Sequence, residues 1–80
     1  MPKIYVIIEN VVDLAYDDVV ETCILGFVLQ NEVSKFLDKE MKQRSKEQTL
    51  NHLRFDDGSI WYQVGPTGYL LYAEELKKLI

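Results

Sequence analysis

The sequence predicts a single α+β domain over residues 1–80, with a small antiparallel β-sheet, one main helix packed on a face and a short C-terminal helix. Two long runs rich in Val, Ile and Tyr occupy the first third of the chain, and such residues favour strands. An amphipathic helical pattern follows, and two glycine-containing turns then separate short apolar segments. The predicted order is ββαββ(β)α, and its short connections favour antiparallel pairing.

The first two strands carry more apolar surface than one helix covers. Residues Lys3–Glu9 are apolar on both faces, as expected of a central strand. The aspartate-rich segment Asn10–Asp18 is interpreted as a loop. Val19–Leu29 is again β-branched and apolar, and Gly26 inside it indicates a bulge or the close approach of another backbone. The surplus apolar surface predicts a homodimer that hides it.

The main helix is predicted from Asn31 to about Ser45. Asn31 is a favourable N-cap, and Glu32 suits the positive end of the helix dipole. The apolar stripe at helical spacing consists of Val33, Phe36, Leu37 and Met41. The opposite face holds Lys35, Asp38, Lys39, Lys42 and Arg44. The polar residues 43–48 are interpreted as the exit linker.

A hairpin follows the linker. Thr49–Asp56 and Ser59–Val64 are interpreted as its strands, and Gly58 supplies the positive φ that a tight turn needs. In the second strand, Ile60, Tyr62 and Val64 share one face.

A second turn and a terminal helix complete the prediction. Gly65–Gly68 is the turn, and Tyr69–Tyr72 is a short strand or a run into the helix. Ala73–Ile80 is predicted to be helical, because two acidic residues precede two basic ones in the order that the helix dipole favours.

Composition narrows the class of protein. Thirteen acidic and nine basic residues give a net charge of −4, which disfavours direct binding of nucleic acid. No stretch approaches the roughly 20 apolar residues that span a membrane. The single cysteine, Cys23, allows no internal disulfide, as is typical of a reducing cytosol, and we expect it to be a small core residue.

No pattern predicts catalysis, a cofactor or a metal site. The single histidine, His52, has no neighbouring nucleophile and is expected to face solvent. Asp56-Asp57-Gly58-Ser59 resembles the start of a calcium loop but lacks the later ligands. Adjacent acidic pairs such as Asp17 and Asp18 diverge on any regular element, so none forms an obvious catalytic dyad. We therefore expect a protein that is not an enzyme.

The aromatic residues of the second half predict a surface. If Ile60 and Tyr62 face the core, Trp61 faces outward, and exposed Trp and Tyr side chains are favoured anchors of protein interfaces. Three alternatives stay open for Trp61: a surface for another protein, a homodimer contact, or plain core. We predict that Trp61 and Tyr69, with Asp56 and Asp57 at the hairpin tip, form a partner-binding surface.

The hairpin and the start of the sequence carry a resemblance to known proteins. The pattern Phe55–Ser59, then Gln63, Gly65, Thr67 and Tyr69, then Ala73-Glu74-Glu75, resembles small phage-encoded anti-CRISPR proteins, and the first half is similar to short phage proteins with a ββαββ core. The resemblance implies a non-enzymatic inhibitor in the cytoplasm of a bacterial host, which occupies a host defence protein or ribonucleoprotein complex.

Some members of that class mimic DNA, and charge density tests this idea. Duplex DNA carries one charge per about 1.7 Å, so a face about 30 Å long would need roughly 18 negative charges. The chain has 13 acidic residues in total, which argues against extended mimicry. A local acidic patch for a basic partner remains a hypothesis, comprising Glu9, Asp13, Asp17, Asp18 and Glu21.

Two hypotheses of different class result. The first is a protein-binding inhibitor that forms a homodimer. The alternative is a homo-oligomeric protein that binds a small molecule or a nucleotide signal, with aromatic side chains stacking on the ligand.

Overall fold

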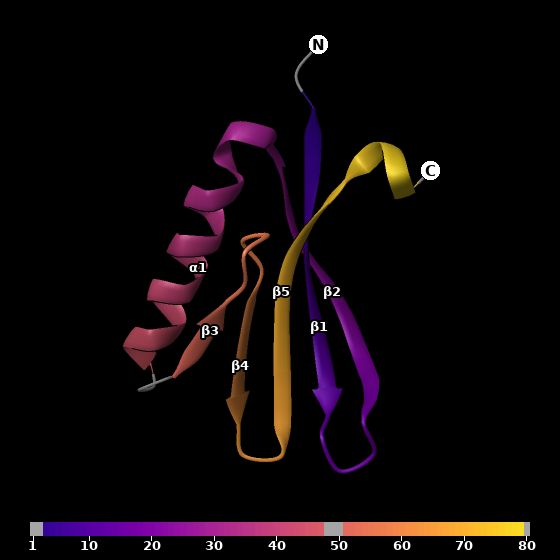
Figure 1. Cartoon of the computed structure of the whole chain (residues 1–80), viewed down its shortest axis with the longest axis vertical. Coiled ribbons are helices and arrows are strands. Elements are labelled where there is room, and N and C mark those ends of the chain that lie inside the picture. The colour runs from indigo at the N-terminus through magenta and orange to yellow at the C-terminus, as the bar shows by residue number, and fades with distance from the viewer. Residues whose placement is uncertain (1–2, 48–50, 80) are drawn as a thin grey trace.

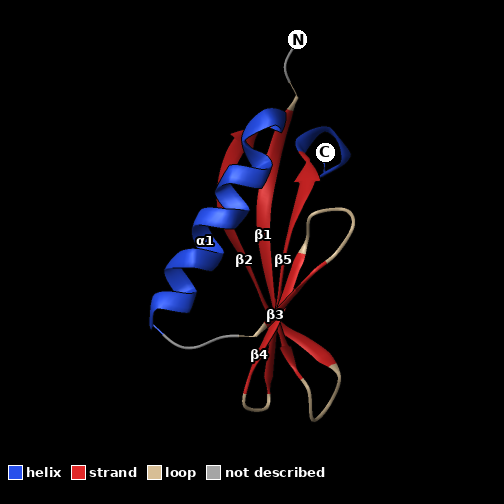
Figure 2. Ribbon diagram, turned by 60° about the vertical axis from the view of Figure 1, so that its left-hand side comes forward, coloured by secondary structure: helices blue, strands red, loops and turns tan. Residues whose placement is uncertain are grey.

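The structure is a computed structural model that describes residues 3–47 and 51–79. Its strands are β1 (Ile4–Asp13), β2 (Asp18–Leu29), β3 (His52–Arg54), β4 (Ile60–Val64) and β5 (Thr67–Glu75). Its helical elements are the 3-10 turn η1 (Gln30–Glu32), the helix α1 (Val33–Glu47) and the 3-10 turn η2 (Leu76–Leu79). The strands form one antiparallel sheet in the order β2-β1-β5-β4-β3, and α1 lies along one side of it (Figures 1 and 2). The predicted α+β class and antiparallel sheet are confirmed.

β1 is longer than predicted, and the loop expected at Asn10–Asp18 is mostly strand. Val11 and Val12 pair with β2 on one side and with β5 on the other. A central strand satisfies its backbone groups on both sides, so pairing carries it through polar Asn10. The chain turns only at residues 14–17, where Asp17 adopts a left-handed φ of 56°.

β2 runs beside β1 with two bulges. The register passes from Gly26 opposite Ile7 to Ile24 opposite Ile8, so Leu25 is an extra residue. A second shift leaves Val20 as an extra residue. The bulge predicted at Gly26 is therefore confirmed, and it bends the strand where α1 approaches.

α1 confirms the predicted apolar stripe but not its predicted ends. Gln30–Glu32 forms a separate 3-10 turn, and α1 begins only at Val33. Asn31 therefore lies inside that turn and is not the N-cap of α1. At the other end, α1 continues to Glu47, so the linker predicted at residues 43–48 is helical through residue 47, and residue 48 lies outside the described residues. The residues there are mostly Lys, Gln, Arg and Glu, which are good helix formers.

The predicted C-terminal helix is wrong. Ala73, Glu74 and Glu75 continue β5, where each pairs with a residue of β1. Only Leu76–Leu79 makes a helical turn, of 3-10 type, beside the start of β1 (Figure 1). A helix of eight residues is marginal by itself, whereas pairing with a central strand satisfies the same backbone groups.

Both predicted turns are present. Gly58 has φ 91°, and Gly65, in the two-residue turn between β4 and β5, has φ 59°. The Leu14 backbone N–H donates to Pro66 O at 3.0 Å, so the β1–β2 and β4–β5 turns lie side by side at one end of the sheet (Figure 1). β3 is shorter than predicted, and residues 49 and 50 of that prediction lie outside the described residues.

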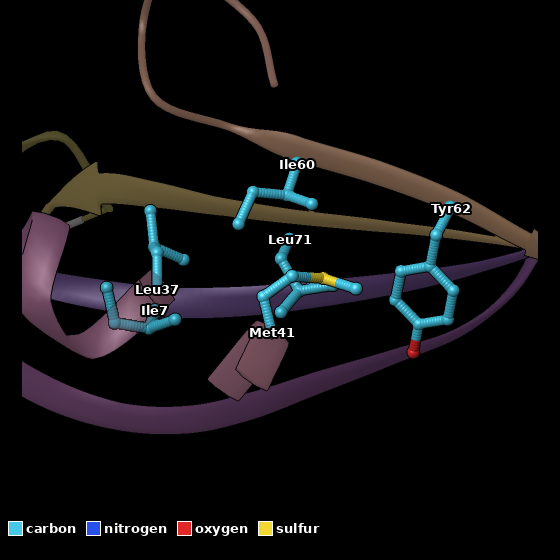
Figure 3. Close-up of a cluster of buried hydrophobic side chains, with 6 residues drawn as sticks. All are labelled: Ile7, Leu37, Met41, Ile60, Tyr62 and Leu71. Carbon is cyan, nitrogen blue, oxygen red and sulfur yellow. The ribbon is translucent and has the colours of Figure 1, made fainter. Parts of the chain in front are cut away.

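The core lies between α1 and one face of the sheet. The buried cluster in Figure 3 joins α1 to β1, β4 and β5 and consists of Ile7, Leu37, Met41, Ile60, Tyr62 and Leu71. Because neighbouring residues of a strand point to opposite faces, this cluster also defines which residues face away from α1.

Gly68→Ala is expected to destabilise the fold by about 1–3 kcal/mol, the usual cost of overpacking. A Cβ at Gly68 would lie 2.2 Å from Cη2 of Trp61, so the indole must move. Thermal melts followed by Trp fluorescence measure both effects. Gly26→Ala is the matched control, because its Cβ would meet Phe36 at 3.4 Å. Equal melting temperatures for the two variants would contradict the packing of Trp61 on Gly68.

Candidate functional site: the open face of the sheet

The sheet has a second face, turned away from α1, which we call the open face. Strand register and alternation place on it Ile4, Val6, Ile8, Asn10 and Val12 of β1, Val19, Thr22, Ile24, Phe27 and Leu29 of β2, Gly68, Leu70, Tyr72 and Glu74 of β5, Trp61 and Gln63 of β4, and Leu53 of β3. Val6 and Ile8 are buried there because they lie on a central strand between large neighbours. Most of the other members are apolar side chains that remain in contact with solvent.

Exposure is greatest along β2. Ile24 is 63% exposed and Phe27 is 61% exposed, and Val19 and Leu29 continue the same row. Across the sheet, Leu53 of β3 is also exposed. Single exposed apolar residues are ordinary on a protein surface, whereas a contiguous apolar face marks a site of interaction.

Trp61 is half-buried on the open face, as its predicted outward orientation requires. Its ring lies over Gly68 of the neighbouring strand, whose missing side chain leaves room for the indole. Trp61 therefore has a local packing role in addition to any role at an interface. Trp61 covers the backbone of β5 and also presents its exposed part on the open face.

The structure separates the other residues predicted for the aromatic surface. Tyr69 lies on the face that carries α1, where its ring stacks on Tyr62 with centroids 4.8 Å apart. Asp56 is exposed at the β3–β4 turn. Asp57 accepts hydrogen bonds from the hydroxyl and the backbone N–H of Ser59, at 2.6 and 2.9 Å, which hold the pKa of its carboxyl below the ordinary value. Asp57 thus has a role in the turn itself, and Trp61 and Tyr69 do not share one surface.

Of the five acidic residues predicted for a patch, Asp13, Asp17 and Asp18 lie together, whereas Glu9 is buried in an ion pair with Arg44 and Glu21 accepts a hydrogen bond from Cys23. Asp13 ends β1, Asp17 is in the turn and Asp18 begins β2, all at one tip of the sheet. Asp13 Oδ1 accepts the Ala15 backbone N–H at 3.0 Å, so this side chain also caps the turn. Asp17 and Asp18 are exposed and can meet a basic partner.

Sequence reasoning missed a buried polar cluster between α1 and the sheet. The guanidinium of Arg44, predicted to face solvent, forms an ion pair with Glu9 and donates to the hydroxyl of Tyr62. Arg44 Nε lies 3.7 Å from Glu40 Oε2. Burial would lower the pKa of Arg44, but its hydrogen bond to Tyr62 and the charge of Glu9 outweigh burial and raise it. For the Tyr62 hydroxyl, burial acts in the other direction and raises the pKa.

A signal for this cluster was present in the sequence. Glu9 shares strand parity with Ile7, so it points to the core face, and a buried carboxylate needs a charged partner. Arg44 follows Leu37 by seven residues and therefore lies on the inner side of the helix. Arg44 thus links α1 to Glu9 and Tyr62 of the sheet, and within this cluster Glu9 Oε2 and Arg44 Nε have ion-pair partners but no hydrogen bond.

The outer surface of α1 is basic. Lys35, Lys39, Lys42 and Lys46 recur at intervals of four, three and four residues and are all exposed. A groove of about 520 Å³ between α1 and β3 is lined by Asp38, Met41, Lys42, Ser45, Lys46, His52 and Arg54. An ion pair between Arg54 and Asp38 crosses this groove. His52 is exposed, as predicted.

Cys23 is not the core residue that its neighbours predicted. It is half-buried on β2, and its thiol donates to Glu21 Oε1 at 3.4 Å. That hydrogen bond, with the negative charge of Glu21, raises the pKa of the thiol. The protonated, weakly nucleophilic form is therefore favoured.

Glu21→Gln is expected to speed alkylation of Cys23 by iodoacetamide at pH 8. Removal of the carboxylate charge lowers the pKa of the thiol, and the thiolate fraction at a fixed pH then rises. For the wild type and for Glu21→Gln, the alkylation rate should increase with pH, and the increase should occur at a lower pH in Glu21→Gln. Asp18→Asn, which removes the same charge elsewhere on β2, is the control, and identical rates for all three proteins would refute the role of Glu21.

Comparison of the chain with models of protein families, with curated proteins and with solved structures finds no match in any of the three. Within residues 3–47 and 51–79, no three His, Cys, Asp or Glu side chains gather in a way that could hold a metal ion. None of the helices described for this chain is long and apolar enough to cross a membrane. The open face is therefore the feature of the described structure that most needs a functional explanation.

Proposed function

We propose that the protein is a non-enzymatic protein-binding module whose working surface is the open face. The observation that carries the proposal is the row of exposed apolar side chains along β2, on the face that α1 leaves uncovered. Such side chains gain free energy when another protein excludes water from them, by about 25 cal/mol for each Å² of apolar surface. Trp61, on the same face, is of the residue type most enriched at the centre of interfaces.

Within this class, the resemblance of the hairpin to phage-encoded inhibitors makes a bacterial defence complex the first partner to test. The acidic tip, defined by Asp13, Asp17 and Asp18, supports this narrower role because exposed carboxylates suit a basic partner surface. The cytoplasm of a bacterial host is the compartment that this role requires.

The test uses the full chain as bait in a bacterial lysate, with retained proteins identified by mass spectrometry. Proteins bound through the open face should be retained by the wild type and lost from Phe27→Asp, which puts a charge in the exposed apolar row that β2 contributes to that face. Tyr16→Asp adds the same charge to an apolar residue that is 78% exposed in the β1–β2 turn and should change nothing. If Phe27→Asp retains the same proteins as the wild type, the open face is not the working surface.

The groove between α1 and β3 favours the second candidate, binding of an anionic small molecule such as a nucleotide. Lys42, Lys46, His52 and Arg54 line it. Neither Tyr62 nor Tyr69 lines this groove, so their stacked rings do not supply the aromatic contact that this candidate expected. Calorimetric titration with nucleotides tests this candidate, and Lys42→Glu should abolish any binding that the groove supports.

A further inference from the structure

We infer that the occupant of the open face is a second copy of this chain, packed sheet against sheet in a two-fold dimer. The inference rests on the proposed role of the open face as a protein-docking surface and names the partner. Three observations carry it: the area of the face, the distribution of charge over the molecule, and the state of the polar groups within the face.

The area of the open face matches what a stable dimer needs. Strands lie about 4.8 Å apart and rise about 3.4 Å per residue, so the five strands present roughly 600 Å² in projection. A standard interface takes about 800 Å² of accessible surface from each partner, and the accessible surface of a side-chain layer exceeds its projection. Two such faces pack about 10 Å apart with interdigitating side chains, as in a β-sandwich.

Charge is concentrated away from the open face. The chain carries a net charge of −4, so two copies repel one another unless their charges stay apart. Among the described strand residues, Glu74, at the end of β5, is the one charged residue that the register places on this face. The lysines of α1 lie on the other side of the sheet, and the acidic tip lies at one end of it, where the register places Asp13 and Asp18 on the face that carries α1. Two identical copies can therefore meet through the open face with little charge repulsion.

The polar groups within the face are partly satisfied by one another. Thr22 Oγ1 donates to Asn10 Oδ1 at 2.9 Å across the β1–β2 pair. Burial of this pair under a second sheet leaves the threonine hydroxyl with its partner, so it does not carry the usual penalty of an unpaired hydroxyl. An apolar face with few unmet polar groups is complementary to its own copy, as a two-fold interface requires.

Sedimentation velocity and acrylamide quenching of Trp61, run over a dilution series, test the inference. Trp61 is the only tryptophan in the chain, so its quenching reports on one position of the open face. The wild type should sediment at twice its 9.4 kDa, and its quenching constant should rise at least about twofold as dilution separates the copies. Phe27→Asp should sediment as a monomer with the higher quenching constant at every concentration, while Tyr16→Asp should behave as the wild type. Phe27→Thr, whose β-branched side chain suits a strand, replaces Phe27→Asp if circular dichroism shows that the aspartate variant is unfolded.

Three outcomes overturn the inference. If the wild type is monomeric at high micromolar concentration, no second copy occupies the open face. A dimer that persists in both Phe27 variants uses another surface. A dimer whose Trp61 is quenched as strongly as in the monomer is joined through a surface other than the open face, such as the free edge of β2, three strands away from Trp61 on β4. If the wild type is monomeric but Phe27→Asp loses the lysate proteins that the wild type retains, the proposed function stands and only the dimer is rejected.

Discussion

Leu37→Ala is expected to lower the free energy of unfolding by about 2–5 kcal/mol, the range for large-to-small changes in a core. Leu37 is 1% exposed and packs in the cluster that joins α1 to the sheet. A domain of 80 residues has only about 4–12 kcal/mol of stability, so the variant should be partly unfolded at room temperature. Its melting temperature should fall by about 10 °C or more.

Urea unfolding followed by circular dichroism measures this effect, at one protein concentration because dimerisation would make stability depend on concentration. Phe55→Ala is the control, since Phe55 is a large apolar residue that is 47% exposed and lies outside the strands and the open face. A loss of less than 1 kcal/mol for Leu37→Ala would mean that α1 does not pack on the sheet as described.

Arg44→Met is expected to cost about 2–4 kcal/mol, because it leaves the carboxylate of Glu9 buried without its cation. The side chains of Arg44 and Glu9 are 22% and 11% exposed, so water can compensate only in part. The double variant Arg44→Met with Glu9→Leu should recover much of the loss, because an apolar pair of similar volume replaces the ion pair. The recovery separates a stranded charge from lost packing.

The exposed ion pair of the same molecule supplies the control. Arg54 and Asp38 form a similar contact, but their side chains are 38% and 52% exposed. Arg54→Met should therefore cost at most about 1 kcal/mol. Equal losses for Arg44→Met and Arg54→Met in urea unfolding would show that burial of the Glu9–Arg44 pair has no energetic consequence.

The parts of the fold that local sequence determines were predictable. Leu37 and Met41 recur at helical spacing, and Gly58 and Gly65 take the positive φ that their turns need. Element ends were less predictable, because pairing with a distant strand decides them. Glu74 and Glu75 have the charge order of a helix start, but β1 lies beside them and offers backbone partners that local pattern does not reveal.

The sequence was enough to predict an apolar interaction surface, but not which residues share one face of the sheet. Strand alternation was enough to turn Trp61 outward, and the double-sided apolar character of the first strands was enough to predict surplus apolar surface. The grouping of Trp61 with Tyr69 failed because it depends on strand register. Tyr69 pairs directly with Tyr62, and that pairing puts its ring on the face that carries α1.

The two bulges of β2 also bear on solubility. β2 is a 12-residue edge strand with several exposed apolar side chains, the type of segment that stacks into cross-β fibrils. Steric zippers need an uninterrupted segment of about six or seven residues with regular alternation. The extra residues Val20 and Leu25 interrupt the alternation, so the straight runs between and after them, 21–24 and 26–29, hold only four residues each. The bulges thus divide a strand that would otherwise template fibril growth into pieces too short to do so, while its apolar side chains remain on the surface.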